Sequence, residues 1–131
     1  MSRHLIDTTV LIAHLRGHDP ARRYLHSLLA DGHDLCTSCV NIAEVEHGLR
    51  PAERKAVAAL LDRLQYLITS REAAHRAGRY QATFSRRGET LSTADAIIAG
   101  TARAHGAVLV TDNLKHFPMT DIRKVRPPLE P

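Results

Sequence analysis

The chain has 131 residues, which is enough for one domain with a hydrophobic core and too few for two. Hydrophobic residues make up 44% and charged residues 24%, and no apolar run approaches the roughly 20 residues that span a bilayer. The formal net charge of +4 is compatible with nucleic-acid binding and also with a merely solubilising surface. We expect a single domain over residues 1–131, with a core over about residues 3–126 and a short Pro-rich C-terminal tail.

The cysteines and the N-terminal segment indicate the cellular compartment. Two cysteines provide no disulfide framework in a domain of this size, which fits a reducing environment. Asp7 interrupts a short apolar stretch near the N-terminus, and no small-residue cleavage site follows, so we expect no signal peptide. We therefore expect a cytoplasmic protein without membrane association.

Short apolar runs alternate along the chain with longer segments of helical periodicity. The short runs predict strands at residues 4–6, 34–37, 65–68, 107–110 and 122–125. Apolar residues spaced three and four apart predict helices over residues 21–29 and 56–64. Pro51 lies at the expected first turn of the second of these helices, where its missing N–H is tolerated.

Two longer helices are predicted in the second half of the chain. One begins at the cap residue Ser70 and ends near Gly88, and the other runs from Ser92 to His105. Short strands separated by helices predict right-handed crossovers, since parallel strands need such connections. The expected fold class is therefore α/β, a three-layer α/β/α domain with a mainly parallel sheet of about five strands.

Four acidic residues are expected near one edge of this sheet. Asp7 directly follows the first strand, and Asp112 follows the fourth strand after one threonine. The carboxyl ends of parallel strands share one edge, where functional residues collect. Asp95 lies in the first turn of the last helix, and Glu44 lies on a helix after the second strand. Both helices leave or return to that edge.

Each of these residues also has a purely local explanation. Asp7 can cap the following helix, Asp95 has the N3 position of a capping box, and Asp112 can belong to a turn. Glu44 is less easily explained, because its helix is apolar on two sides and an unpaired buried charge is costly. Glu46 lies beside the same apolar stripe, so periodicity does not choose between the two glutamates.

A divalent cation explains all four acidic positions at once. Carboxylates that converge without cationic partners repel one another, and this raises the pKa of each. No matching set of lysines or arginines lies near them in the sequence. Mg²⁺ prefers carboxylate oxygens and keeps waters for a phosphate substrate. The pattern is typical of a phosphodiester nuclease, in which the metal activates water and stabilises charge on the scissile phosphate.

Three stretches carry these acidic residues in a recognisable form. In LIDTTVLI a strand ends in Asp-Thr before an apolar helix, and in NIAEVEHGL a glutamate follows a small residue. STADAIIAGTARAHGAVLVTDNLKHF contains Asp-Ala-Ile-Ile-Ala, a small-residue helix, a strand and then Thr-Asp-Asn. Together the stretches span residues 4–117, and they resemble the four motifs of PIN-domain ribonucleases in order and spacing. The small size of the chain resembles the VapC-type toxins of type II toxin–antitoxin systems in particular.

The resemblance implies which residues form the site. The implied catalytic and metal-binding residues are Asp7, Glu44, Asp95 and Asp112. Thr111 is implied as a supporting residue that orients the site. The fourth acidic residue of the family usually stands second after the threonine, where this chain has the neutral Asn113. Either Asp112 turns toward the site, or Asn113 acts through a water molecule.

The resemblance also implies an activity and partners. It implies an endoribonuclease that uses Mg²⁺ or Mn²⁺, forms a homodimer and is blocked by a VapB-type antitoxin. One alternative is a catalytically inactive PIN scaffold that only binds RNA or a protein partner. Another is a redox protein built on the C-x-x-C pair Cys36 and Cys39, against the simpler interpretation of two small buried thiols. Arg86 and Arg87 are candidate contacts for RNA phosphates or, equally, a solvated helix end.

Overall fold

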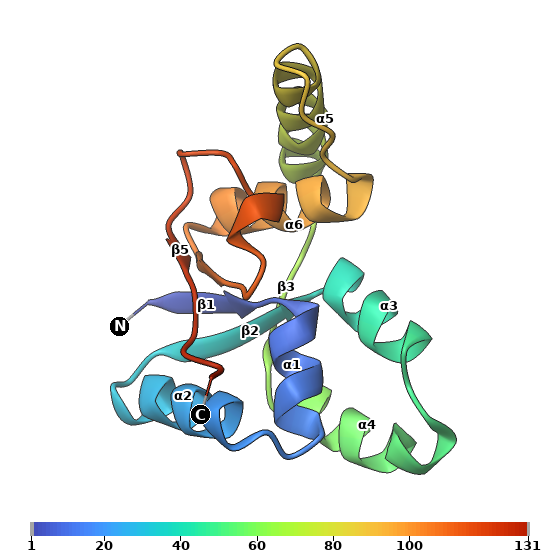
Figure 1. Ribbon diagram of the computed structural model, residues 1–131, viewed down its shortest axis with the longest axis vertical. Helices are drawn as coiled ribbons and strands as arrows, with labels where there is room; N and C mark the ends of the chain where they lie inside the picture. The colour runs from blue at the N-terminus through green and yellow to red at the C-terminus, as the bar shows by residue number, and fades with distance from the viewer. Residues whose placement is uncertain (1, 131) are drawn as a thin grey trace.

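The fold is centred on a five-stranded parallel sheet. The structure is a computed structural model that describes residues 2–130. Its sheet has the strand order β3-β2-β1-β4-β5, and all neighbouring strands are parallel. The strands are β1 (Arg3–Ile6), β2 (Asp34–Ser38), β3 (Gln65–Leu67), β4 (Val108–Val110) and β5 (Lys124–Val125). The predicted three-layer α/β/α fold with a mainly parallel sheet of about five strands is confirmed (Figure 1).

Helices cover both faces of this sheet. They are α1 (Thr8–Leu15), α2 (Asp19–Ala30), α3 (Cys39–His47), α4 (Arg54–Asp62), α5 (Arg71–Ser85) and α6 (Thr93–His105). Two 3₁₀ turns, η1 (Pro51–Glu53) and η2 (Leu114–His116), precede α4 and follow β4. In Figure 1, α1, α2 and α4 lie below the sheet and α5 and α6 lie above it. Helix α3 projects beyond the carboxyl end of β2.

The strands are short and apolar because both of their faces are buried. Leu5 and Leu109 belong to the hydrophobic cluster under α5 and α6. Their neighbours Ile6 and Val110 belong to the cluster between the sheet and the helices α1, α2 and α4. Successive side chains of a strand point to opposite faces, so a strand covered on both sides is apolar throughout. Because β1 and β4 pair in parallel, with Ile6 opposite Val110, their carboxyl ends lie at the same edge of the sheet.

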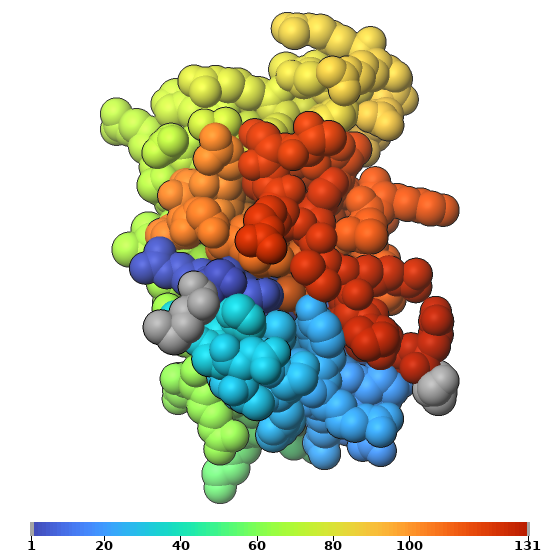
Figure 2. Space-filling view, turned by 90° about the vertical axis from the view of Figure 1, so that its left-hand side faces the viewer, coloured from blue at the N-terminus to red at the C-terminus, as the bar shows by residue number. Residues whose placement is uncertain are grey.

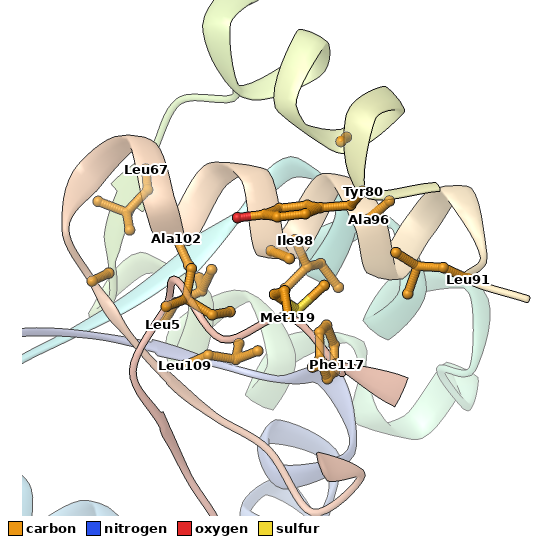
Figure 3. Packing of buried hydrophobic residues seen from close by; sticks show 14 of the residues in the cluster. Leu5, Leu67, Tyr80, Leu91, Ala96, Ile98, Ala102, Leu109, Phe117 and Met119 are labelled. Atoms are coloured by element: carbon orange, nitrogen blue, oxygen red, sulfur yellow. The ribbon is translucent and has the colours of Figure 1, made fainter. Parts of the chain in front are cut away.

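Helices α5 and α6 pack with their backbones unusually close. A Cβ atom at Gly100 would lie 2.4 Å from the carbonyl oxygen of Ala73, so only glycine fits at this crossing. Figure 3 shows Tyr80 of α5 lying over Ala96 and Ile98 of α6, with Phe117 beneath them. This packing fixes the position of α6, and its N-terminal turn lies at the carboxyl edge of the sheet.

The predicted element ends are correct where a local cap sets them. The Ser70 hydroxyl accepts a hydrogen bond from the Ala73 amide at 3.1 Å and begins α5. The Ser92 hydroxyl does the same for the Asp95 amide at 3.1 Å and begins α6. Pro51 begins η1, a tighter turn that leads into α4, rather than the α-helix itself.

The predicted strand over residues 122–125 is longer than the observed β5, which contains only Lys124 and Val125. Met119 and Ile122 are buried in the cluster between the sheet and the helices α5 and α6, so the chain before Lys124 follows that cluster, and only the Arg123 carbonyl oxygen bonds to β4, where it accepts from the Leu109 amide at 2.8 Å. The Lys124 ammonium group holds this loop, because it donates to the carbonyl oxygens of Phe117 and Met119 at 2.7 Å each.

The described part of the chain contains no helix that is both long and apolar enough to cross a membrane. The Pro-rich C-terminal segment lies against the start of α2, where the His18 Nε2 atom is 2.5 Å from the carbonyl oxygen of Leu129.

Candidate functional site

A pocket of about 830 Å³ lies at the carboxyl edge of the sheet. It is formed by the end of β1, helix α3, the first turn of α6 and the segment after β4. The residues that line it are Asp7, Thr8, Thr9, Cys39, Val40, Ala43, Glu44, His47, Ser92, Ala94, Asp95, Asn113 and His116. Three of the four predicted acidic residues, Asp7, Glu44 and Asp95, thus meet in one pocket although they belong to separate segments.

Asp7 is the most buried of these carboxylates, with 5% of its surface exposed. Its Oδ1 atom accepts from the Thr8 amide at 2.9 Å, and its Oδ2 atom accepts from the Thr111 hydroxyl at 2.8 Å. Burial raises the pKa of Asp7, and the charges of Asp95 and Glu44 raise it further, although the two hydrogen bonds offset part of this rise. Asp7 therefore both caps α1 and faces the pocket.

The structure distinguishes the two glutamates of α3. Glu44 lines the pocket, and its Oε1 atom accepts a hydrogen bond from the Thr8 hydroxyl at 2.7 Å. Glu46 is exposed, and its carboxylate lies 3.7 Å from Arg54. Periodicity did not choose between Glu44 and Glu46. The structure places Glu44 at the pocket, as the motif resemblance implied.

A chain of buried hydrogen bonds leads to Glu44, and sequence analysis did not find it. The Ser38 hydroxyl donates to Asn41 Oδ1 at 2.6 Å, and Asn41 Nδ2 donates to the Thr8 hydroxyl oxygen at 3.2 Å. Ser38 and Asn41 are fully buried. Because Thr8 accepts from Asn41, its own proton points to Glu44. The available signal was an asparagine between two apolar residues, Val40 and Ile42, one turn before Glu44.

Asp95 lies in the first turn of α6, where the helix dipole favours a negative charge. Its side chain lines the pocket, and its Oδ2 atom lies 3.5 Å from the Nδ1 atom of His116. His116 belongs to η2 and was not predicted as a site residue. The imidazole adds a polar, largely exposed group to the wall of the pocket.

The segment after β4 presents Asn113, and not Asp112, to the pocket. Asn113 is one of the lining residues, and its amide donates to the Thr111 hydroxyl oxygen at 3.0 Å. Asp112 lies outside the lining, and its Oδ1 atom is 3.2 Å from the Nε atom of Arg126. Of the two predicted alternatives, this placement favours Asn113. The turn orients Asp112 toward Arg126, a residue fourteen positions further along the chain.

The predicted RNA contacts lie away from the pocket. Arg86 and Arg87 follow the last turn of α5 and are exposed. The Arg87 guanidinium lies over the Phe84 ring, 5.3 Å from its centroid. Neither arginine lines the acidic pocket, so their role in RNA binding stays a prediction.

The two cysteines are both free, and they have different environments. Cys36 is buried in β2, whereas Cys39 is exposed at the pocket wall, so the prediction of two buried thiols is wrong for Cys39. The reason is that β2 ends at Ser38 and Cys39 begins α3. Burial raises the pKa of Cys36 to about 11. A redox pair needs a thiolate of lowered pKa, so this environment argues against redox chemistry.

The residues of the pocket fit a hard divalent cation. The three carboxylates supply oxygen donors, which Mg²⁺ and Mn²⁺ prefer. Among the described residues that line the pocket there is no lysine or arginine to neutralise them. Within residues 2–130, no three His, Cys, Asp or Glu side chains are arranged to hold one ion as they stand. Glu44 is turned to Thr8 and Asp95 to His116, so side-chain rotation would accompany binding.

Comparison with known proteins agrees with this geometry. The model of the PIN domain family matches residues 4–121. Ribonuclease VapC10 of Mycobacterium tuberculosis is 39% identical over 124 residues, which are 95% of this chain and 91% of the relative. The structure of VapBC2 from Rickettsia felis bound to promoter DNA matches with a TM-score of 0.84 at 21% identity, over 95% of this chain and 98% of that one. DNA-bound VapBC from Salmonella typhimurium matches with a TM-score of 0.82 at 26% identity, over 96% and 98% of the two chains.

Proposed function

This chain belongs to the PIN-domain family, and from that premise we propose that it is a metal-dependent endoribonuclease, the toxin of a VapBC-type toxin–antitoxin pair. One observation carries the proposal. Asp7, Glu44 and Asp95, which are far apart in the sequence, line one pocket in which no lysine or arginine is present among the described lining residues. The similar protein VapC10 is a ribonuclease, which supports RNA as the substrate.

The chain's own residues have distinct roles in the proposed site. Asp7, Glu44 and Asp95 would hold Mg²⁺ or Mn²⁺ through carboxylate oxygens. When bound, the cation supplies a water of lowered pKa and neutralises charge on the scissile phosphate. Thr111 and the Thr8 amide keep Asp7 turned toward the pocket, and the Thr8 hydroxyl orients Glu44. We assign Thr111 as a supporting residue for this reason.

The fourth position of the site is assigned to Asn113. Its side chain lines the pocket, whereas Asp112 is paired with Arg126. An amide oxygen can contact a water or a phosphate in the pocket, but it adds no negative charge. We therefore propose that three carboxylates, and not four, hold the cation, with Asp112 outside the site.

The partners and the location are proposed with the activity. The matched solved structures are toxin–antitoxin complexes, so we propose that a VapB-type antitoxin binds this chain. We also propose a homodimer, which the family resemblance implies, and a cytoplasmic location, where RNA is found. The domain assignment, a single PIN domain over residues 1–131, is part of the same proposal.

A digestion assay tests the activity directly. Purified protein should cleave RNA internally in the presence of Mg²⁺ or Mn²⁺, should stop when EDTA is added, and should recover when the metal is restored in excess. Products with new internal ends, mapped by sequencing, distinguish an endonuclease from an exonuclease. Metal binding without any cleavage of transfer, ribosomal or messenger RNA would instead favour the inactive scaffold.

A further inference from the structure

A second concave site lies between α5 and the loop that follows Phe117. Its volume is about 280 Å³. Two arginines of α5, Arg76 and Arg79, and Arg87 just after the helix line the cleft together with residues 119–121. We name it the arginine cleft. Figure 2 shows the segment after Phe117 (red) lying directly beneath α5 (yellow-green) on this side of the molecule. The acidic pocket and the arginine cleft share none of their lining residues.

The arginine cleft has an excess of positive charge. Asp121 lies in it, with its Oδ2 atom 3.6 Å from both Arg76 and Arg103, and its Oδ1 atom accepts from the Tyr80 hydroxyl at 2.8 Å. The exposed Glu72 lies 3.9 Å from Arg76. In and around the cleft there are thus two carboxylates and four guanidinium groups, those of Arg76 and Arg103 in ion pairs and those of Arg79 and Arg87. Two positive charges are left uncompensated.

The donors of these arginines are not used up within the fold. Across residues 2–130, neither Arg79 nor Arg87 forms an ion pair. The Nε atom of Arg76 is shielded from solvent and has no hydrogen-bond acceptor in that part of the chain. A shielded donor without an acceptor is costly, and buried polar groups are nearly always paired. The cleft therefore has guanidinium donors that are free to bind a further negatively charged acceptor besides Asp121.

Phosphate is the anion that this geometry fits. Guanidinium groups bind phosphate oxygens with paired, charge-assisted hydrogen bonds. The hydroxyl groups of Thr83 and Thr120 also line the cleft and can donate to such oxygens. The floor contains the buried rings of Tyr80 and Phe84, which keep the neighbouring charges in a medium of lower dielectric constant than water.

The arginine cleft is close to the acidic pocket along the chain. His116 lines the pocket, and Met119 lines the cleft. Three residues span at most about 11 Å when fully extended. The rise per nucleotide along one strand of a duplex is roughly 3.4 Å. An RNA strand that occupies the pocket can therefore reach the cleft within a few nucleotides.

From these observations, and resting on the proposed function, we propose that the arginine cleft binds a backbone phosphate of the RNA substrate a few nucleotides from the bond that is cut. Arg79 and Arg87 are the principal contacts, and Arg76 completes the set. Of the two arginines considered from the sequence, Arg87 belongs to this subsite, and Arg86 does not line it.

The test measures RNA binding in the background of Asp95→Asn. This substitution should prevent cleavage, so the RNA survives the measurement. Affinity for a labelled single-stranded RNA of about 20 nucleotides is measured by fluorescence anisotropy over a range of salt concentrations. Arg79→Gln combined with Arg87→Gln should weaken binding roughly 10- to 30-fold near 0.1 M salt and should reduce the salt slope by about 0.7, as expected for one lost phosphate contact. Arg79→Lys with Arg87→Lys should restore most of the slope, because the charge remains.

The matched control removes the same charge elsewhere. Arg3→Gln combined with Arg23→Gln changes two exposed arginines that line neither the pocket nor the cleft. The proposal would be overturned if the variant Arg79→Gln with Arg87→Gln had the same RNA affinity and salt slope as this control. Unchanged RNA affinity with loss of binding to polyglutamate would also overturn it and would assign the cleft to an acidic protein.

A cleavage measurement separates this proposal from the proposed function. When Asp95 is kept, Arg79→Gln combined with Arg87→Gln should raise KM for long RNA without changing kcat. This variant should cleave a trinucleotide as the wild type does. A wild-type protein that cuts no RNA would contradict the proposed function, whereas the binding measurement with Asp95→Asn still decides whether the cleft holds phosphate. Unchanged KM for long RNA in an active protein would contradict the cleft alone.

Discussion

Asp121 and Asp7 show two ways of keeping an aspartate in this fold. Asp121 lies beside Arg76 and Arg103, and the Tyr80 hydroxyl donates to it. Within residues 2–130, Asp7 accepts hydrogen bonds from neutral donors alone, the Thr8 amide and the Thr111 hydroxyl, and the nearby charges of Asp95 and Glu44 are negative. The first carboxylate is neutralised within the chain. The second is not, although it is the more deeply buried of the two.

This difference separates structural from functional carboxylates. A structural carboxylate gains stability from its own cationic partners, as Asp112 does from Arg126. Asp7 lacks such a partner among the described residues, so burial and the negative charges of Asp95 and Glu44 raise its pKa and destabilise the metal-free fold unless an external cation joins the carboxylates. The four predictions below test that difference, from the largest expected effect to the smallest.

The largest effect is expected from removing one charge of the pocket. Asp95→Asn should lower RNA cleavage more than about 100-fold, since even residues that only support metal ligands cost 10- to 100-fold. The fold should be retained, because the Ser92 cap bonds the Asp95 amide and not its side chain. The matched change Asp121→Asn should leave kcat at saturating RNA within about twofold. Equal losses in the two variants would remove the distinction between the two regions.

The next effect concerns the hydroxyl that orients Glu44. Thr8→Val keeps the shape of the side chain but removes the donor to Glu44 and the acceptor for Asn41. Mn²⁺ affinity, measured by calorimetry, should fall about 10- to 100-fold. The free energy of unfolding should fall by about 1–3 kcal/mol, because the Asn41 amide loses its acceptor. The control is Thr9→Val, a change at an exposed side chain of the same pocket. Unchanged Mn²⁺ affinity in Thr8→Val would show that Glu44 does not need this hydroxyl.

A third prediction concerns pH and stability without metal. Burial raises the pKa of Asp7 in the folded state, so the charged form is disfavoured there, and wild-type stability is lost as pH rises through that pKa. Metal-free Asp7→Asn should therefore be more stable than the metal-free wild type at neutral pH. The advantage should shrink on acidification, because protonation neutralises the wild-type residue.

Magnesium should reverse this order of stability. At 100 times its Kd, a ligand that binds only the folded state adds about 2.7 kcal/mol to stability. Thermal unfolding with and without Mg²⁺ checks this, and the gain should appear in the wild type and be largely absent in Asp7→Asn. A wild type that is more stable than Asp7→Asn at neutral pH without metal would refute the repulsion argument.

The smallest effect is expected at Asp112. Asp112→Asn removes a carboxylate that pairs with Arg126 at the surface, so cleavage should stay within about twofold of the wild type. Kinetics at saturating Mg²⁺ measure this. A loss comparable to that of Asp95→Asn would mean that Asp112 turns into the pocket and serves as a fourth ligand.

Local sequence features determined much of the fold. The caps Ser70 and Ser92 set the starts of α5 and α6 through hydrogen bonds to residues only three positions away. The short apolar strands followed from their burial on both faces, and the shared carboxyl edge of parallel strands placed Asp7 and the segment 111–113 close together. These features depend on neighbours in sequence or on the general rules of parallel sheets, so a single sequence is enough to predict them.

Only the tertiary structure decided which polar groups face one another. The burial of Asn41, the exposure of Cys39 and the pairing of Asp112 with Arg126 depend on contacts between segments that sequence periodicity does not relate. A turn such as residues 111–113 can present either of two adjacent side chains to the same pocket. The partner that each one finds elsewhere in the fold determines which side chain points inward, and it also determines which carboxylates still need a cation.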